Sequence, residues 1–274
     1  MKSNNRKKFH FPLFKRKYLC IPYSVFMFLF VIVPIAIILY YAFTDAKGYF
    51  SFDALVNFFT NWSKINTLIV SVFIATQTTI ICLLIGYPLA YFLASKKYNK
   101  NAVLVTLFIA PMWINFVVRT LATRDLLTWM GINGGNSPYL ATLIGMVYNY
   151  IPFVILPLYT TMLKLDKYQI EAAADLGASP VRVFVQNILP QSFPGIISAC
   201  MMTFMPTMSS YVISDTLSEG KITLFGNYIY LNFTTSAWND GSFMATIMLA
   251  IIFISMAISG SFSKKDERKG GGVW

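Results

Sequence analysis

Long stretches without a charged side chain recur along this sequence. A helix needs about 20 predominantly apolar residues to cross the hydrocarbon core of a bilayer, so each stretch predicts a transmembrane helix. The predicted spans cover residues 19–43, 67–94, 102–118, 139–163, 190–213 and 242–262. The third is only just long enough. The first follows a basic N-terminus but is too long for the apolar core of a cleaved signal peptide, so we expect it to remain as a helix.

Residues 222–239 are also free of charge but are rich in asparagine, serine and threonine. Polar side chains of this kind are costly in lipid. We therefore predict an outer loop here, and the sequence leaves open whether it contains a short surface helix.

The distribution of lysine and arginine orients the predicted spans. With six spans, 17 of the 22 cationic residues lie on the side of the two termini and five lie on the other. Cytoplasmic loops carry such an excess, so both termini are predicted to be cytoplasmic. This gives a basic tail at 1–17, a transmembrane domain at 18–263 and a second tail at 264–274.

Composition supports a polytopic all-α membrane protein. Hydrophobic residues make up 56% of the chain, charged residues 12%, and the mean hydropathy is +0.59. These values exclude a disordered chain, a disulfide-stapled domain and an ordinary soluble enzyme. The net charge of +11 is explained by topology, so no nucleic-acid partner is expected.

Few residues suit metal or covalent chemistry. The three cysteines lie in apolar segments, and the single histidine, His10, lies in the basic tail. No cluster with metal-ligand spacing is present in the sequence, and we expect neither a metal site nor catalytic residues.

The segment 164–190 has the local signals of a helical elbow. Asp166 is a suitable N-cap for a short helix, and Gly177 suits the left-handed residue beyond its end. Ser179 and Pro180 then suit the start of a second helix that leads to the fifth span. From these features alone the elbow could lie on the membrane surface or contact a partner.

The same segment resembles the EAA loop of binding-protein-dependent ABC importer permeases. That motif has Glu-Ala-Ala, a glycine after three more residues, and Ile-x-Leu-Pro after another nine. The matching residues are Glu171, Ala172, Ala173, Gly177, Leu189 and Pro190. Asn187 departs from the motif at the isoleucine position.

The resemblance implies the six-helix, MetI-like fold of type I ABC importer permeases in the cytoplasmic membrane. It implies that the loop is a coupling helix that docks on a cytoplasmic ATPase. The chain has no phosphate-binding Walker motif, so ATP and Mg²⁺ are expected in that partner, with no cofactor in this chain. Two ATPase subunits, a second permease subunit and an external substrate-binding protein complete such an importer. The outer loops 45–66 and 215–241 are where we expect the binding protein to dock.

Three segments resemble the first permease subunit of spermidine/putrescine transporters. They run from Ala110 to Arg119, from Leu163 to Lys167 and from Pro206 to Asp215. The resemblance implies polyamine import. Cations of this kind favour aromatic faces and carboxylates, so the pathway candidates are Trp113, Tyr148, Tyr211 and Asp215.

Two alternatives remain at this stage. Arg119 and Arg124, at the outer end of the third predicted span, could bind an anion such as phosphate or a sulfonate, or could cap the helix and snorkel to the interface. A membrane-embedded enzyme or scaffold is the other alternative, and the lack of intramembrane histidine and paired carboxylates argues against it.

Overall fold

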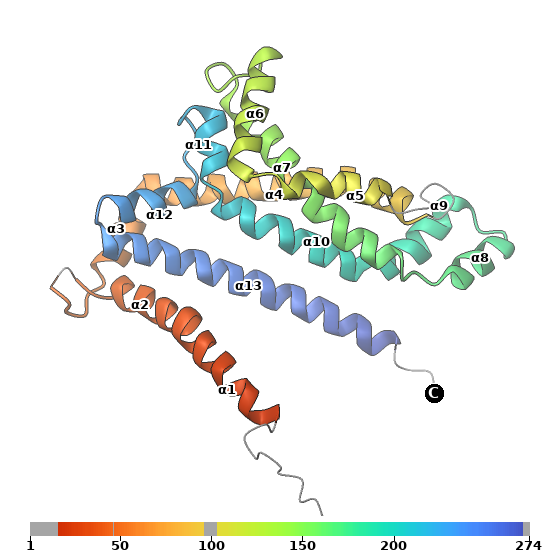
Figure 1. Cartoon of the computed structure of the whole chain (residues 1–274), viewed down its shortest axis with the longest axis horizontal. Helices are drawn as coiled ribbons and strands as arrows, with labels where there is room; N and C mark the ends of the chain where they lie inside the picture. Colours follow the sequence, from red (N-terminus) through yellow and green to blue (C-terminus); the bar gives the residue numbers. More distant parts are fainter. Residues whose placement is uncertain (1–15, 46, 96–102, 271–274) are drawn as a thin grey trace, which may run out of the picture.

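The computed structural model describes residues 16–45, 47–95 and 103–270 and is built from helices (Figure 1). The helices are α1 (Arg16–Met27), α2 (Val33–Ala42), α3 (Asp53–Thr60), α4 (Trp62–Ala94), α5 (Val103–Ile109), α6 (Phe116–Trp129), α7 (Pro138–Met162), α8 (Lys167–Asp175), α9 (Pro180–Val183), α10 (Leu189–Ser209), α11 (Val212–Ser218), α12 (Phe225–Thr234) and α13 (Trp238–Gly270). π-helical turns at Phe28–Ile32 and Phe184–Ile188 join α1 to α2 and α9 to α10, and a 3₁₀ turn at Ala110–Trp113 extends α5.

Five of the predicted spans are confirmed as helices long and apolar enough to cross a membrane. They are Cys20–Ala42, Trp62–Ala94, Pro138–Met162, Pro180–Ser209 and Trp238–Gly260. The fifth begins earlier than predicted because the second helix of the elbow runs into it without a break, and it ends at Ser209 rather than at 213. The last helix continues to Gly270, through most of the segment predicted as a C-terminal tail.

The prediction of one continuous third span at 102–118 is wrong. Helix α5 and its 3₁₀ turn end at Trp113, and α6 starts at Phe116 after a bend of 97°. The side chain of Asn115 caps the new helix, accepting from the backbone N–H groups of Val117 and Val118 at 2.9 and 3.3 Å. If the bent pair is one broken span, the described residues contain six spans.

Helices α4, α7 and α10 form the centre of the molecule, where they pack through small residues. A Cβ atom on Gly86 of α4 would lie 2.8 Å from Val154 of α7, and one on Gly195 of α10 would lie 2.6 Å from Thr161. Close backbone approach of this kind is typical of helix packing in membranes. Residues of α11 close the core at one end, where Leu217 packs against Gly145.

A second apolar cluster joins α2, α3, α12 and α13. Its fully buried residues include Phe225 at the start of α12, and Phe58 and Phe243 pack beside it. The segment 222–239, predicted as an outer loop with the presence of a helix left open, contains the helix α12. This helix is anchored in the core and is not a free surface loop. The first span is held at this end only, and α1 diverges from α13 (Figure 1).

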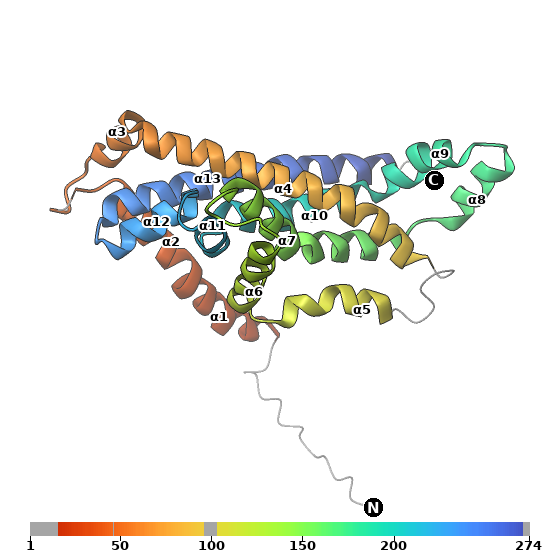
Figure 2. The ribbon, with the colours of Figure 1, turned by 90° about the horizontal axis from the view of Figure 1, so that it is seen from above.

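The elbow α8–α9 and the α3–α12 region lie at opposite ends of the bundle in both views (Figures 1 and 2). The long helices α4, α10 and α13 run between them. If the elbow is cytoplasmic, as its sequence predicts, the α3–α12 end faces outward.

Candidate functional site

The first helix of the elbow has the predicted caps at both ends. The side chain of Asp166 accepts from the backbone N–H of Tyr168 at 3.0 Å. At the other end the backbone N–H of Gly177 donates to Ala174 at 2.9 Å and that of Ala178 donates to Ala173 at 3.1 Å. This pair of bonds is a Schellman motif, and Gly177 adopts the required left-handed conformation with φ +79°.

The second half of the elbow is fixed to the fifth span. Ser179 accepts from the backbone N–H of Arg182 at 3.4 Å, and Pro180 occupies the first helical position, as predicted. Sequence reasoning missed Gln191 on α10. Its side-chain oxygen accepts from the Asp166 backbone N–H at 3.1 Å, and its amide donates to Gln169 at 3.2 Å. These two bonds tie α8 to the start of α10.

The elbow presents an unpartnered apolar surface beside a carboxylate. Glu171 and Ala172 are exposed and Ala173 is half-buried. Tyr168 and Leu176, on the same helix and at its end, are 82% and 88% exposed. Leu189 is half-buried and Pro190 is exposed where α10 begins. Two large apolar side chains are thus exposed beside the Glu171 carboxylate.

The four pathway candidates fall in two places. Trp113 ends the 3₁₀ turn with 81% of its surface exposed, and Tyr148 of α7 is 43% exposed. Tyr211 precedes α11, and Asp215 lies one helical turn later with its backbone N–H bonded to the Tyr211 carbonyl at 2.9 Å. Tyr211 stacks on Tyr230 of α12, with ring centroids 4.7 Å apart and planes 9° from parallel. Tyr230 was missed because its segment was predicted to be mainly loop.

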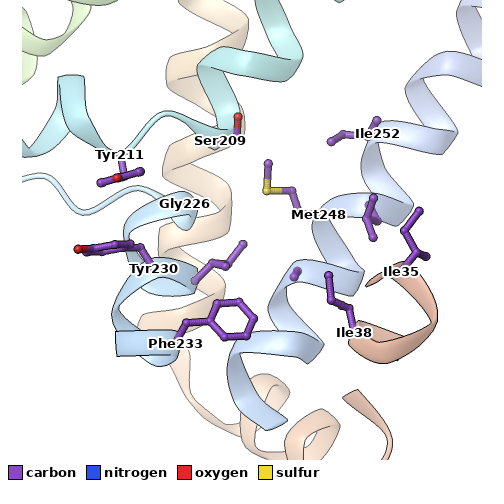
Figure 3. Close-up of a pocket in the computed structure, with 12 residues that line it drawn as sticks. Ile35, Ile38, Ser209, Tyr211, Gly226, Tyr230, Phe233, Met248 and Ile252 are labelled. Atoms are coloured by element: carbon purple, nitrogen blue, oxygen red, sulfur yellow. The ribbon is translucent and has the colours of Figure 1, made fainter. Parts of the chain in front are cut away.

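Tyr211 and Tyr230 form one wall of a cavity of about 490 Å³ (Figure 3). Ile35 and Ile38 of α2 lie on the opposite wall, with Met248 of α13 between. Among the described residues, the lining contains no charged side chain. The cavity suits an apolar group, and Asp215 is not part of its lining.

Arg119 occupies a position that the sequence did not predict. It is 7% exposed, and its Nε donates to Oδ1 of Asn149 at 2.8 Å. Its remaining nitrogens donate to the carbonyls of Pro111 at 2.8 Å and Asn149 at 3.4 Å. The guanidinium also lies over the Tyr148 ring, 5.8 Å from the centroid. The alternative that Arg119 caps the outer end of a continuous third span and snorkels to the interface is wrong. Arg119 is buried near the start of α6, and its bond to Pro111 is made to the last turn of the half-helix before the break.

Arg124, the second arginine considered for anion binding, lies at the surface. It pairs with the adjacent Asp125 at 3.1 Å, and both side chains are largely exposed. The described residues contain no group of three or more histidine, cysteine or carboxylate side chains placed to hold a metal ion.

Residues 84–265 match the family described as binding-protein-dependent transport system inner membrane component. The match contains the whole elbow. The chain belongs to this family. It is a multi-pass permease subunit of the inner, cytoplasmic membrane.

Individual relatives of the permease cover most of its length. The spermidine/putrescine transport system permease protein PotB of Haemophilus influenzae is 32% identical over 87% of this chain and 92% of its own. PotB of Escherichia coli K12 is 34% identical over 68% of this chain and 74% of its own.

Solved structures share the fold of the permease at low identity. A chain of a bacterial alginate ABC transporter, crystallised with an alginate-bound periplasmic protein, superposes with a TM-score of 0.68 at 14% identity. It covers 91% of this chain and 93% of that one. A chain of an amino acid ABC transporter gives 0.54 at 18% identity, with 73% of this chain and 92% of that one covered. The MetI-like importer fold expected from the EAA-type loop is thus confirmed.

Proposed function

We propose that this permease forms part of the pathway by which an ATP-driven importer carries polyamines, such as spermidine and putrescine, into the cell. The observation that carries the proposal is the identity of 32% to a spermidine/putrescine permease over 92% of that relative's length. The resemblance of Ala110–Arg119 and Pro206–Asp215 to polyamine permeases agrees with it.

An anion substrate has little support from the two arginines that suggested it. Arg119 is buried and bonded to Asn149 and Pro111. Arg124 is paired with Asp125. Phosphate or sulfonate recognition requires cationic groups whose donors are free to bind the anion.

The pathway is proposed to include Trp113, Tyr148, Tyr211 and Asp215. Their aromatic faces can bind ammonium groups by cation–π attraction, and the exposed Asp215 carboxylate adds an opposite charge near the outer end. Weak contacts spread over several places suit transport, because a substrate must leave each site after entering it.

The elbow is proposed as the coupling site for a cytoplasmic ATPase, which would bind ATP and Mg²⁺. Glu171, Ala172 and Ala173 would contact the ATPase, with Tyr168 and Leu176 packing into its groove. Gly177 holds the turn, and Leu189 and Pro190 start the span that transmits the movement. Two ATPase subunits, a second permease and an external binding protein would complete the importer.

Uptake of labelled spermidine by cells that lack this chain tests both proposals. Cells complemented with the native chain are expected to take up spermidine, whereas Glu171→Arg is expected to reduce uptake at least about tenfold, since a reversed charge in a docked interface costs several kcal/mol. Asp125→Arg, a reversal at an exposed acid on α6, is the matched control and should retain uptake.

The outcomes separate substrate from coupling. Competition by unlabelled putrescine but not by phosphate or sulfonate supports the polyamine assignment, and the reverse pattern would overturn it. Native uptake by a fully assembled Glu171→Arg complex would instead remove the coupling role and leave the substrate assignment intact.

A further inference from the structure

The buried arginine at the break of the third span is held by three oxygen acceptors, one on each of its nitrogens. The Pro111 carbonyl lies in the last turn before the break, and both Asn149 oxygens come from α7. Asn149 is fully buried, and its amide nitrogen donates to the Gly145 carbonyl at 2.9 Å. That bond leaves the side-chain oxygen of Asn149 directed at Arg119.

This cation has no carboxylate partner among the residues that the structure describes. The two ion pairs found there are Lys64–Asp240 and Arg124–Asp125. A buried charge is costly unless its donors are satisfied, and a charged residue within a membrane protein is a candidate for function. Part of the compensation comes from the Pro111 carbonyl, at the negative C-terminal end of the α5 helix and its 3₁₀ turn.

Arg119 and its two partner residues belong to three different elements. Arg119 itself lies in the first turns of α6, and Pro111 lies in the last turn of the preceding half-helix. Asn149 belongs to α7, which connects directly to the elbow. The guanidinium therefore joins the two halves of the third span to the fourth. A planar fork with several donors can make these bonds at once, which a lysine ammonium on a single flexible stem cannot do in the same geometry.

We propose that Arg119 is a positioning residue for transport. Its guanidinium locks the bend of the third span onto α7 and thereby fixes the exposed Trp113 and the Tyr148 ring in their places. Arg119 contacts no substrate. The inference rests on the proposed function only for its uptake measurement, because the angle between α5 and α6 can be measured without any substrate.

The test uses the assembled importer in proteoliposomes, with the native cysteines Cys20, Cys82 and Cys200 replaced by serine. Spin labels at Leu107→Cys on α5 and Leu126→Cys on α6 report the bend, since both side chains are exposed. The distance distribution is measured for the native chain and for Arg119→Lys, Arg119→Gln and Arg119→Ala. Arg124→Gln, an exposed arginine on the same helix, is the matched control.

Arg119→Lys and Arg119→Gln are expected to broaden the distance distribution and to lower spermidine uptake roughly tenfold, because small displacements of positioned groups have large effects on rate. Arg124→Gln should match the native chain. Added guanidinium ion should narrow the distribution of Arg119→Ala, and an equal concentration of sodium should not.

A narrow, native distribution of the spin-label distance in Arg119→Lys would overturn the proposal that the planar guanidinium is needed to hold the bend. If Arg119→Gln does not assemble, Asn149→Ser removes the side-chain acceptor instead, and a native distribution there would equally contradict the proposal. A broadened distribution with no change in spermidine uptake would also overturn it, provided that the native importer transports spermidine. If the native importer transports no spermidine, the substrate assignment fails. The measured distances still test whether Arg119 holds the bend of the third span against α7.

Discussion

At the residue scale, the elbow shows how one backbone conformation determines a residue type. Gly177 has φ +79°, and a Cβ atom there would meet no atom within 4 Å. Packing therefore does not require glycine at this position. The left-handed backbone does, because a side chain in that region costs about 1–2 kcal/mol.

Gly177→Ala is accordingly expected to destabilise the end of α8 by about 1–2 kcal/mol and to leave the transmembrane bundle unchanged. Hydrogen exchange of the α8 amides in the solubilised complex measures this local effect. Gly260→Ala is the matched control, since that glycine also has open space around it but lies within α13 without a positive φ. Faster exchange in α8 for both variants, or for neither, would contradict the argument.

Local signals explain which parts of the candidate sites the sequence could predict. Asp166, Gly177 and Ser179 act on backbone groups within three residues or define the turn itself, so their roles follow from the sequence. The position of the Arg119 side chain depends on its bond to Asn149, 30 residues away along the chain. That of the Gln191 side chain depends on its bond to Asp166, 25 residues away. Contacts at such distances arise only from the packed fold.

At the scale of elements, one carboxylate joins three helices at the end of the bundle opposite the elbow. Lys64 of α4 donates to Asp240 of α13 at 2.9 Å, and Asn57 of α3 donates to the same carboxylate oxygen at 2.9 Å. The lysine side chain is 8% exposed and the aspartate 25%. Desolvation makes such a pair a weak source of net stability, but removing one partner leaves a charge uncompensated.

Lys64→Met alone is expected to lower the free energy of unfolding by about 2–3 kcal/mol, below the cost for a fully buried pair because Asp240 is partly exposed. The double variant Lys64→Met with Asp240→Leu should recover most of that loss. Thermal unfolding of the solubilised protein measures all of the variants, including Asp240→Leu alone. A double variant no more stable than either single variant would refute the interpretation.

Hydrophobic length predicted five spans well because lipid demands an uninterrupted apolar helix. The same criterion failed at the third span, where a charge-free stretch at 102–118 contains a break. The local signals for that break were Pro111 and the capping residue Asn115, which sequence length alone does not weigh.

At the scale of the whole molecule, the packing of α7 on α4 decides how often the chain crosses the membrane. Tyr139 bonds to Gln77, Cys82 bonds to the Val147 carbonyl at 3.6 Å, and Gly86 packs on Val154. From one of these contacts to the next the residue number increases on α4 and on α7 alike, so the two helices run parallel. Helix α10 runs the other way, since Tyr87 meets Ser192 and Tyr150 meets Pro206. Two parallel spans require one crossing between them, and the broken pair α5–α6 must supply it.

This geometry, with the cationic asymmetry of the loops, predicts which residues a membrane-impermeant thiol reagent can reach. In a chain without native cysteines, Trp129→Cys at the end of α6 is expected to react only from outside and Tyr168→Cys on α8 only from the cytoplasm. Both side chains are more than four-fifths exposed, so reactivity reports sidedness and not burial. Right-side-out and inside-out vesicles provide the two faces. Reaction of both positions from the same face would mean that α5–α6 re-enters without crossing, which the parallel packing of α4 and α7 does not allow.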